Sequence, residues 1–158
     1  MRTRTLWTYL YLTTGLGLIT AIYAGLETLD PSLRSSCTIS SFFSCGKVDS
    51  SGLTNTFGIP DGAIGIAGFL IILILAGLAE RHTADLRFFY ALLFVTTGGV
   101  AFASYFAYVE LAEIHALCPV CTTAYIFGFL AWLGAIALTV RMRREAEPEM
   151  ARPSESVS

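Results

Sequence analysis

The chain has 158 residues, of which 54% are hydrophobic and 14% charged, and its formal net charge is −2. Together with a mean hydropathy of +0.65, this composition is rare in soluble domains and typical of a membrane protein. The small net charge, with no basic stripe away from the membrane flanks, gives no indication of nucleic acid as a partner.

Four apolar stretches have the length of a membrane-spanning helix. They cover residues 6–26, 59–79, 88–109 and 117–140, and the one charged residue within them is Asp61. About 20 helical residues cross a hydrocarbon core of roughly 30 Å, and uninterrupted apolar runs favour helices over barrel strands. The first stretch is too long for a signal peptide and lacks a small-residue cleavage site, so we expect a retained span. The sequence therefore predicts an all-α membrane protein, a four-transmembrane-helix bundle.

The basic residues predict the orientation of the spans. Eight of the ten lie before the first span, between the second and third, or after the fourth, namely Arg2, Arg4, Arg81, Arg87, Arg141, Arg143, Arg144 and Arg152. Only Arg34 and Lys47 lie on the other side. Because basic loops stay in the cytoplasm, we expect both termini inside. The long loop 27–58 and the turn 110–116 should then lie outside.

The chain is expected to form one domain. Residues 1–144 should be the four-helix transmembrane domain. Residues 145–158, which are short, polar and rich in Pro, Ser and Glu, should be a disordered cytoplasmic tail. Small residues should let the spans approach one another closely. Those are Gly15, Gly17, Gly65, Gly68, Gly98 and Gly99.

The outer loop between the first two spans is 32 residues long, too long for an idle connector. It contains Cys37 and Cys45, with Phe42 and Phe43 between them. The two aromatic residues indicate either a loop that folds back over the membrane surface or one that is merely anchored at the interface.

A C-P-V-C motif opens the last span at the outer surface. Pro119 suits the first helical position, where its missing N–H is not needed, so Cys118 should take the cap position and Cys121 the third helical position. Both sulfurs would lie at the positive end of the helix dipole, which favours a thiolate. The alternatives are an inert disulfide or buried thiols, and a structural zinc site. The spacing of the loop cysteines does not match a second zinc knuckle, so no metal is expected.

Two cysteine pairs at one membrane surface predict redox chemistry, since paired cysteines oxidise outside the cytoplasm. Their pattern resembles the vitamin K epoxide reductase family. Two loop cysteines separated by seven residues and a C-x-x-C opening the last of four spans carry the resemblance. So do the stretches C-G-K-V followed by S-S, F-G-I-P before span 2, Y-F-A-Y from Tyr105, and C-P-V-C-T-T-A-Y ending at Tyr125. The resemblance covers roughly residues 6–140.

The resemblance implies a membrane thiol oxidoreductase that supports disulfide formation. Such a protein oxidises a secreted thioredoxin-fold partner on the outer side and passes two electrons to a quinone of the menaquinone, ubiquinone or vitamin K type. It implies that Cys37 and Cys45 are the shuttle pair. It also implies that Cys118 and Cys121 are the active-site pair, with Cys121 acting on the quinone. A prokaryotic-type member in the cell membrane, without a fused thioredoxin domain and hence with a separate partner, is expected.

The resemblance further implies that Tyr125 and Asp61 hydrogen-bond the quinone, although the family often has Asn where this chain has Asp61. Tyr125 lies one helical turn after Cys121 on the same face. An aromatic packing role is its alternative. An acidic residue at membrane depth indicates function, but Asp61 could also simply stabilise the start of a helix. His115, near the C-P-V-C motif, is expected to be an interfacial turn residue.

Three other functions stay open. One is a vitamin K quinone or epoxide reductase proper. Another is a different four-helix, quinone-linked thiol oxidase, which is disfavoured because its C-x-x-C lies in the first outer loop. The third is a non-enzymatic tetraspan protein whose disulfides only staple its outer loops.

Overall fold

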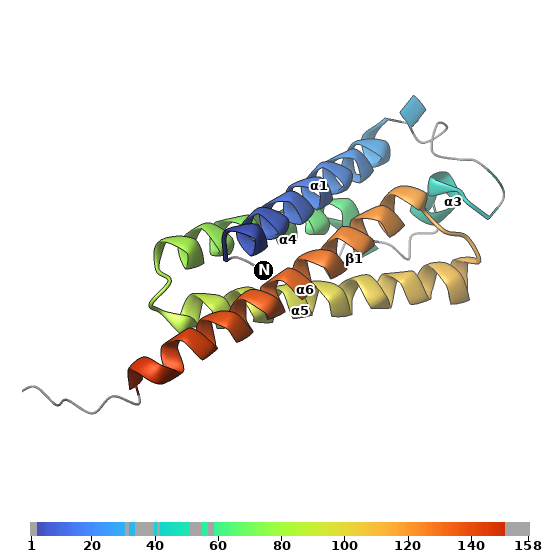
Figure 1. Cartoon of the computed structure of the whole chain (residues 1–158). Coiled ribbons are helices and arrows are strands. Elements are labelled where there is room, and N and C mark those ends of the chain that lie inside the picture. The colour runs from blue at the N-terminus through green and yellow to red at the C-terminus, as the bar shows by residue number, and fades with distance from the viewer. Residues whose placement is uncertain are drawn as a thin grey trace, which may run out of the picture.

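A computed structural model of the chain describes residues 3–30, 32–33, 40, 42–50, 55–56 and 59–150, with the backbone alone for 49–50, 55–56, 59–61 and 147–150. Long helices make up nearly all of the described chain (Figure 1). In order, the elements are α1 (Thr3–Leu29), α3 (Cys45–Ser50), β1 (Asn55–Thr56), β2 (Ile59–Pro60), α4 (Asp61–Arg81), α5 (Leu86–Val109), η1 (Glu110–Ile114) and α6 (Pro119–Met150).

The predicted four-span bundle is confirmed. Four helical segments are long and apolar enough to cross a membrane: Thr3–Leu29, Gly62–Arg81, Leu86–Ile114 and Pro119–Ala146. α1 packs against α4 and α6, and α5 packs against the same two helices. The chain is therefore an integral membrane protein that crosses the bilayer several times.

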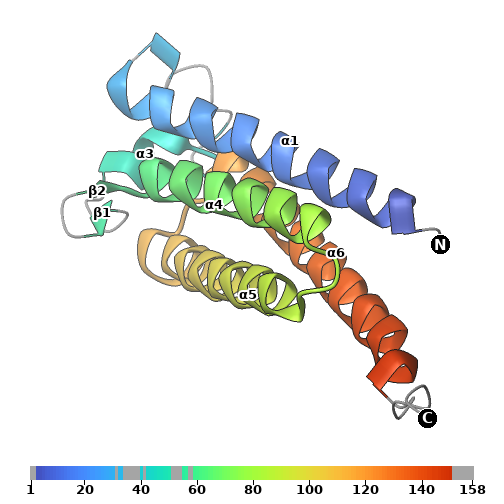
Figure 2. The same cartoon turned by 90° about the vertical axis from the view of Figure 1, so that its left-hand side faces the viewer.

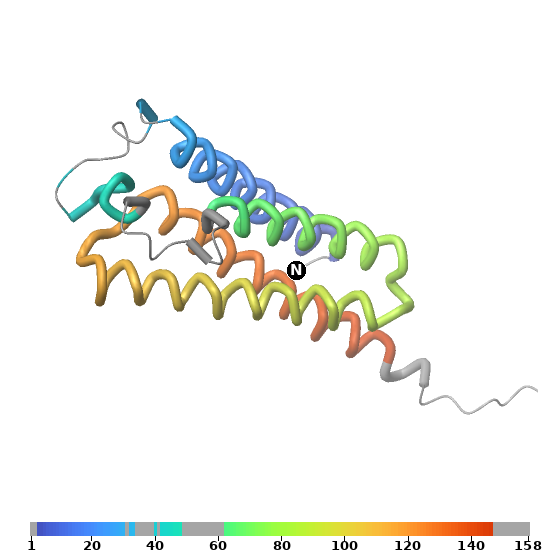
Figure 3. Tube along the Cα trace, turned by 180° about the vertical axis from the view of Figure 1, so that it is seen from behind, coloured from blue at the N-terminus to red at the C-terminus, as the bar shows by residue number. Residues whose placement is uncertain are grey.

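The helices run up and down, so the connections gather at two ends of the bundle. The start of α1, the turn between α4 and α5 and the end of α6 lie at one end (Figure 2). The short helix α3 and the turn between α5 and α6 lie at the opposite end, as the view from behind also shows (Figure 3). All the cysteines in the described residues lie at the α3 end, namely Cys45, Cys118 and Cys121.

The end of the third span differs from the prediction. Residues 110–116 were expected to form an outer turn, but Glu110–Ile114 continues the helix as one turn of π-helix. The chain reverses only at His115, whose φ of 55° is left-handed, and the Ala116 N–H donates to the Glu110 carbonyl at 3.1 Å. In the wider π-helical turn the backbone N–H and C=O groups still form hydrogen bonds, and Glu110 lies in the protein interior.

Two further boundaries differ. The helix α6 continues to Met150, although disorder was expected from residue 145. An ion pair one turn apart, Arg141 Nε to Glu145 Oε1 at 3.0 Å, helps to extend it. The second span was predicted to begin at residue 59, but α4 begins at Asp61. Ile59 and Pro60 form the strand β2, which pairs antiparallel with β1, with Thr56 opposite Ile59. The division into a domain 1–144 and a tail stays a prediction.

The apolar core lies toward the end of the bundle that carries the termini. Its fully buried side chains include Leu10 of α1, Phe89 and Leu92 of α5, and Leu138 of α6. Gly17 allows a close approach as predicted, because a Cβ there would clash with the Phe69 ring. Gly15, Gly68, Gly98 and Gly99 have no neighbour within 4 Å of such a Cβ, so close helix contact is not their role.

Candidate functional site

The C-P-V-C motif adopts the predicted geometry. The helix α6 begins at Pro119, and the Cys121 N–H donates to the Cys118 sulfur at 3.2 Å. This is the hydrogen bond of a capping side chain to the third helical residue, here with sulfur as the acceptor. Cys118 is buried, with 2% of its surface exposed, and Cys121 is half-buried.

The outer loop is joined to the start of α6 by backbone hydrogen bonds. The Leu117 N–H donates to the Phe42 carbonyl at 2.8 Å, and the Ser44 N–H donates to the Leu117 carbonyl at 3.1 Å. The resulting parallel bridge pairs Phe43 with Leu117. Because these segments immediately precede Cys45 and Cys118, the bridge sets the two cysteines side by side.

The two sulfurs are in direct contact. The Cys45 Sγ lies 3.3 Å from the Cys118 Sγ, a non-bonded distance, since a disulfide bond is about 2.05 Å long. Cys45 is engaged in a disulfide, whereas Cys118 and Cys121 are thiols. Cys37 lies outside the described residues. A thiol held against a disulfide sulfur is the arrangement that thiol–disulfide exchange requires.

A buried carboxylate from the π-helical turn organises the motif. Glu110 is fully buried; its Oε2 accepts the Cys118 N–H at 2.9 Å and its Oε1 accepts the Tyr125 hydroxyl at 2.9 Å. It therefore ties the cap of α6 to a side chain two turns further along. Glu110 was not predicted as a site residue, because an acidic residue at the end of an apolar run is typical of an outer turn.

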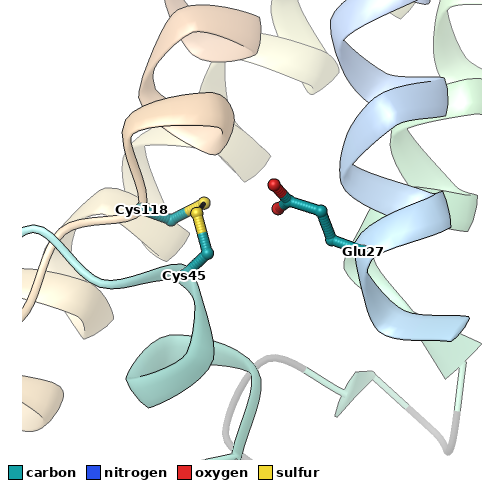
Figure 4. A group of neighbouring side chains, drawn as sticks. All are labelled: Glu27, Cys45 and Cys118. Carbon is teal, nitrogen blue, oxygen red and sulfur yellow. Dashed lines mark hydrogen bonds between the residues drawn. The ribbon is translucent and has the colours of Figure 1, made fainter. Parts of the chain in front are cut away.

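A second buried carboxylate comes from the end of α1. Glu27 has 5% of its surface exposed, and one of its carboxylate oxygens and the Cys45 and Cys118 sulfurs all lie within 4.8 Å of one another. Figure 4 shows the carboxylate turned toward the two sulfurs. Among the described residues this group also has the spacing of a metal site. Because Cys45 is in a disulfide, its sulfur is no thiolate ligand, and the group does not fit zinc in this state.

A cavity of about 310 Å³ opens between the helices beneath the motif. Cys121 and Tyr125 line it, and Cys118 is not among its lining residues. Gly68, Gly98 and Gly99 also line it, so these glycines leave space where a side chain would fill it. The lining is almost wholly apolar, as in sites that bind small hydrophobic molecules.

The structure brings together most of the predicted site. Cys45, Cys118, Cys121 and Tyr125 meet around the α6 start and the cavity. The side chain of Asp61 lies outside the described part of the chain, so its proposed contact stays a prediction; the next residue, Gly62, lines the cavity. His115 is an exposed turn residue, in agreement with the interpretation given to it.

The family comparison agrees with this geometry. A model of the vitamin K epoxide reductase family matches residues 8–137, which include most of the first and fourth spans, all of the second and third, the outer loop and the C-P-V-C motif. Members of that family are membrane oxidoreductases with redox-active cysteines. The match covers most of the chain, and the chain therefore belongs to the vitamin K epoxide reductase family.

Proposed function

We propose that the protein oxidises a secreted thioredoxin-fold thiol protein and passes the two electrons to a membrane quinone through its two cysteine pairs. The observation that carries this proposal is the 3.3 Å contact between the Cys45 and Cys118 sulfurs. A protein whose disulfides only link its outer loops does not require a thiol that is buried against a disulfide. An electron relay requires that contact.

The first half of the relay reduces the loop pair. One partner thiolate attacks the Cys37–Cys45 disulfide at Cys37, and Cys45 leaves. The second partner thiol then displaces Cys37, so the partner leaves oxidised with a disulfide of its own. The loop cysteines have gained the two electrons that the partner lost.

The second half moves the electrons inward. The Cys45 thiolate attacks Cys118 of the Cys118–Cys121 disulfide, which forms a Cys45–Cys118 bond and releases Cys121 as a thiolate. Cys37 then attacks Cys45, which re-forms the loop disulfide and releases Cys118. The observed state, with Cys45 in a disulfide and Cys118 and Cys121 as thiols, corresponds to the end of this transfer.

The cavity fits a quinone head group. Its volume of about 310 Å³ falls at the lower end of the range for small-molecule sites, about 300–1,000 Å³. A quinone bound there would accept two electrons and two protons as the Cys118–Cys121 disulfide re-forms. Cys121, which lines the cavity, is the sulfur that faces it.

Tyr125 and Glu110 offer a proton path to the same cavity. The Tyr125 hydroxyl donates to Glu110, so in this state its hydrogen is directed at the carboxylate. Protonation of Glu110 would let the carboxylic acid donate to the Tyr125 oxygen instead. The Tyr125 hydrogen would then be able to turn into the cavity and donate to a quinone carbonyl.

The orientation of the relay follows from charge. Arg81, Arg87 and the arginines of α6 lie at the end of the bundle that carries the termini, which the positive-inside rule assigns to the cytoplasm. The cysteines would then face the outer side, where a secreted partner is available. A prokaryotic cell membrane is the membrane proposed.

Thiol titration tests the function directly. We expect the protein in the observed state, with Cys45 in a disulfide and Cys118 and Cys121 as thiols, to lose these two thiols when a quinone is added in detergent under anaerobic conditions, with one quinol formed for each disulfide. Mapping of alkylated cysteines, together with quinol absorbance, measures both. A protein with stapling disulfides alone would show the same thiols with and without quinone, and that result would remove the proposal.

Replacing Tyr125 with Phe should weaken quinone turnover and leave the protein level unchanged. Loss of one hydrogen bond to a ligand costs about 0.5–1.5 kcal/mol, which is about 2- to 12-fold in affinity or rate. Steady-state kinetics with several quinones measure the change. Tyr108→Phe, at an exposed position on α5, is the matched control. Identical constants for both variants would exclude Tyr125 from the quinone site.

A Cys45→Ala variant should trap the partner. The lone Cys37 thiol would attack the disulfide of the oxidised partner, and without Cys45 to displace the partner thiol the mixed disulfide at Cys37 would accumulate. Acid-quenched extracts and peptide mapping would show the adduct at Cys37, and a Cys37→Ser/Cys45→Ala variant should trap none. An adduct that mapped to Cys118 would mean that electrons bypass the loop.

A further inference from the structure

We propose that Glu27 carries the proton between Cys45 and Cys118 during exchange between the two cysteine pairs. The inference deepens the relay proposed above and rests on it. The relay requires Cys45 to lose a proton before it attacks and Cys118 to gain one after it leaves. Both residues are almost fully buried, with 3% of Cys45 and 2% of Cys118 exposed, so bulk water has little access to either thiol.

The position of Glu27 suits this role. One of its carboxylate oxygens lies within 4.8 Å of both sulfurs, and it approaches from α1, a different element from either cysteine (Figure 4). That separation is within reach of a proton acceptor acting directly or through one water. Glu27 is itself buried, and an acidic side chain near membrane depth indicates a function.

The protons and electrons balance over the exchange. Glu27 takes the proton of the Cys45 thiol, and the thiolate attacks the Cys118–Cys121 disulfide. Cys121 leaves as the thiolate that faces the cavity. When the Cys37 thiolate, having released its own proton to the medium, re-forms the Cys37–Cys45 bond, Cys118 leaves as a thiolate and takes the proton from Glu27. The carboxylate returns to its starting state, and two electrons have moved from the loop pair to the active-site pair.

Other titratable groups lie on the elements at the same end of the bundle. Cys45 and Lys47 come from α3, Glu110 and His115 from the turn after α5, and Cys121 from α6. All of these residues are the same in the wild type and in a Glu27 variant. A difference between the two pH profiles therefore reports Glu27.

The test follows the exchange without any quinone. The fully oxidised, full-length protein is mixed with dithiothreitol, quenched with acid at successive times, and alkylated. Peptide mapping then gives the reduction of Cys37 and Cys45 and, later, of Cys118 and Cys121. At high dithiothreitol the second rate becomes independent of its concentration and measures the internal exchange. A Cys37→Ser/Cys45→Ser variant, which has no loop thiol, measures direct attack of dithiothreitol on Cys118–Cys121.

We expect Glu27→Gln to slow the internal exchange by about 100-fold at neutral pH, the lower end of what a positioned base contributes. The loss should shrink as the pH rises and hydroxide takes over deprotonation of Cys45. The rate of the first step, in which dithiothreitol attacks the loop disulfide, should be the same as in the wild type. Glu27→Asp should retain the wild-type pH profile, and Glu80→Gln, an acid-to-amide change at the other end of the bundle, should behave as wild type.

Two results would overturn the inference. One is an exchange rate and pH profile in Glu27→Gln equal to those of wild type. The other is an equal decrease of the internal exchange rate in Glu27→Asp and Glu27→Gln, because then the shape of the side chain and not its proton would matter. Should Glu27→Gln fail to fold, Glu27→Met, which also lacks an ionisable group, takes its place in both comparisons. The proposed quinone activity is measured separately by the thiol titration, so either idea can fail without the other.

Discussion

Replacing Cys118 with Ser should leave Cys121 as a lone thiolate beside the cavity and produce a new long-wavelength absorbance when quinone is added. A thiolate next to a quinone ring can donate charge into it, and such an interaction absorbs at long wavelength. Cys121 lines the cavity whereas Cys118 does not. The band should therefore appear in Cys118→Ser and be absent from Cys121→Ser, and anaerobic titration in a spectrophotometer measures it.

Turnover should fall to the uncatalysed rate in both variants, because neither can form the Cys118–Cys121 disulfide. The band thus separates two variants that activity alone would not distinguish. A Cys118→Ser/Cys121→Ser double variant is the matched control and should give no band. A band in Cys121→Ser with none in Cys118→Ser would reverse the assignment of the two sulfurs and the order of the relay.

Replacing Glu110 with Ala should destabilise the protein more than any other change outside the cysteines discussed above. Hydrogen bonds to a charged group contribute about 1.5–3 kcal/mol each, and Glu110 accepts two, from the Cys118 N–H and the Tyr125 hydroxyl. Removal also relieves the desolvation of a buried carboxylate, which opposes the loss. We expect the free energy of unfolding to fall by about 2–4 kcal/mol, measured by detergent-denaturant titration.

The neighbouring Glu113 provides the control. It lies on the same π-helical turn but is exposed, so Glu113→Ala should change the free energy of unfolding by about 0.5 kcal/mol or less. Adding Tyr125→Phe to Glu110→Ala should cost little more, since the two residues share one hydrogen bond. Additive losses, or equal losses for Glu110→Ala and Glu113→Ala, would mean that Glu110 does not hold the motif together.

The spans could be predicted from sequence because the physics that selects them is local. A stretch of about 20 apolar residues has no alternative to a helix in a hydrocarbon core. The cap of α6 could also be predicted locally, because Pro119 suits the first helical position and so places Cys118 at the cap. The helix ends were predicted less well. The π-helical turn from Glu110 and the extension of α6 to Met150 depend on hydrogen bonds and an ion pair, which cannot be inferred from hydropathy.

The sequence by itself determined that this is a four-span protein with two cysteine pairs, because span length, basic flanks and a C-x-x-C at a helix start are properties of short segments. Only the tertiary structure decided what those cysteines meet. The bridge between Phe43 and Leu117 joins residues far apart in the chain and sets Cys45 against Cys118. Packing of the aromatic and branched side chains at one end leaves the glycine-lined cavity under Cys121. In the sequence, Glu27 and Glu110 resemble surface acids at the ends of apolar runs. They become buried neighbours of Cys118 only when α1, α3 and the α5–α6 turn pack together.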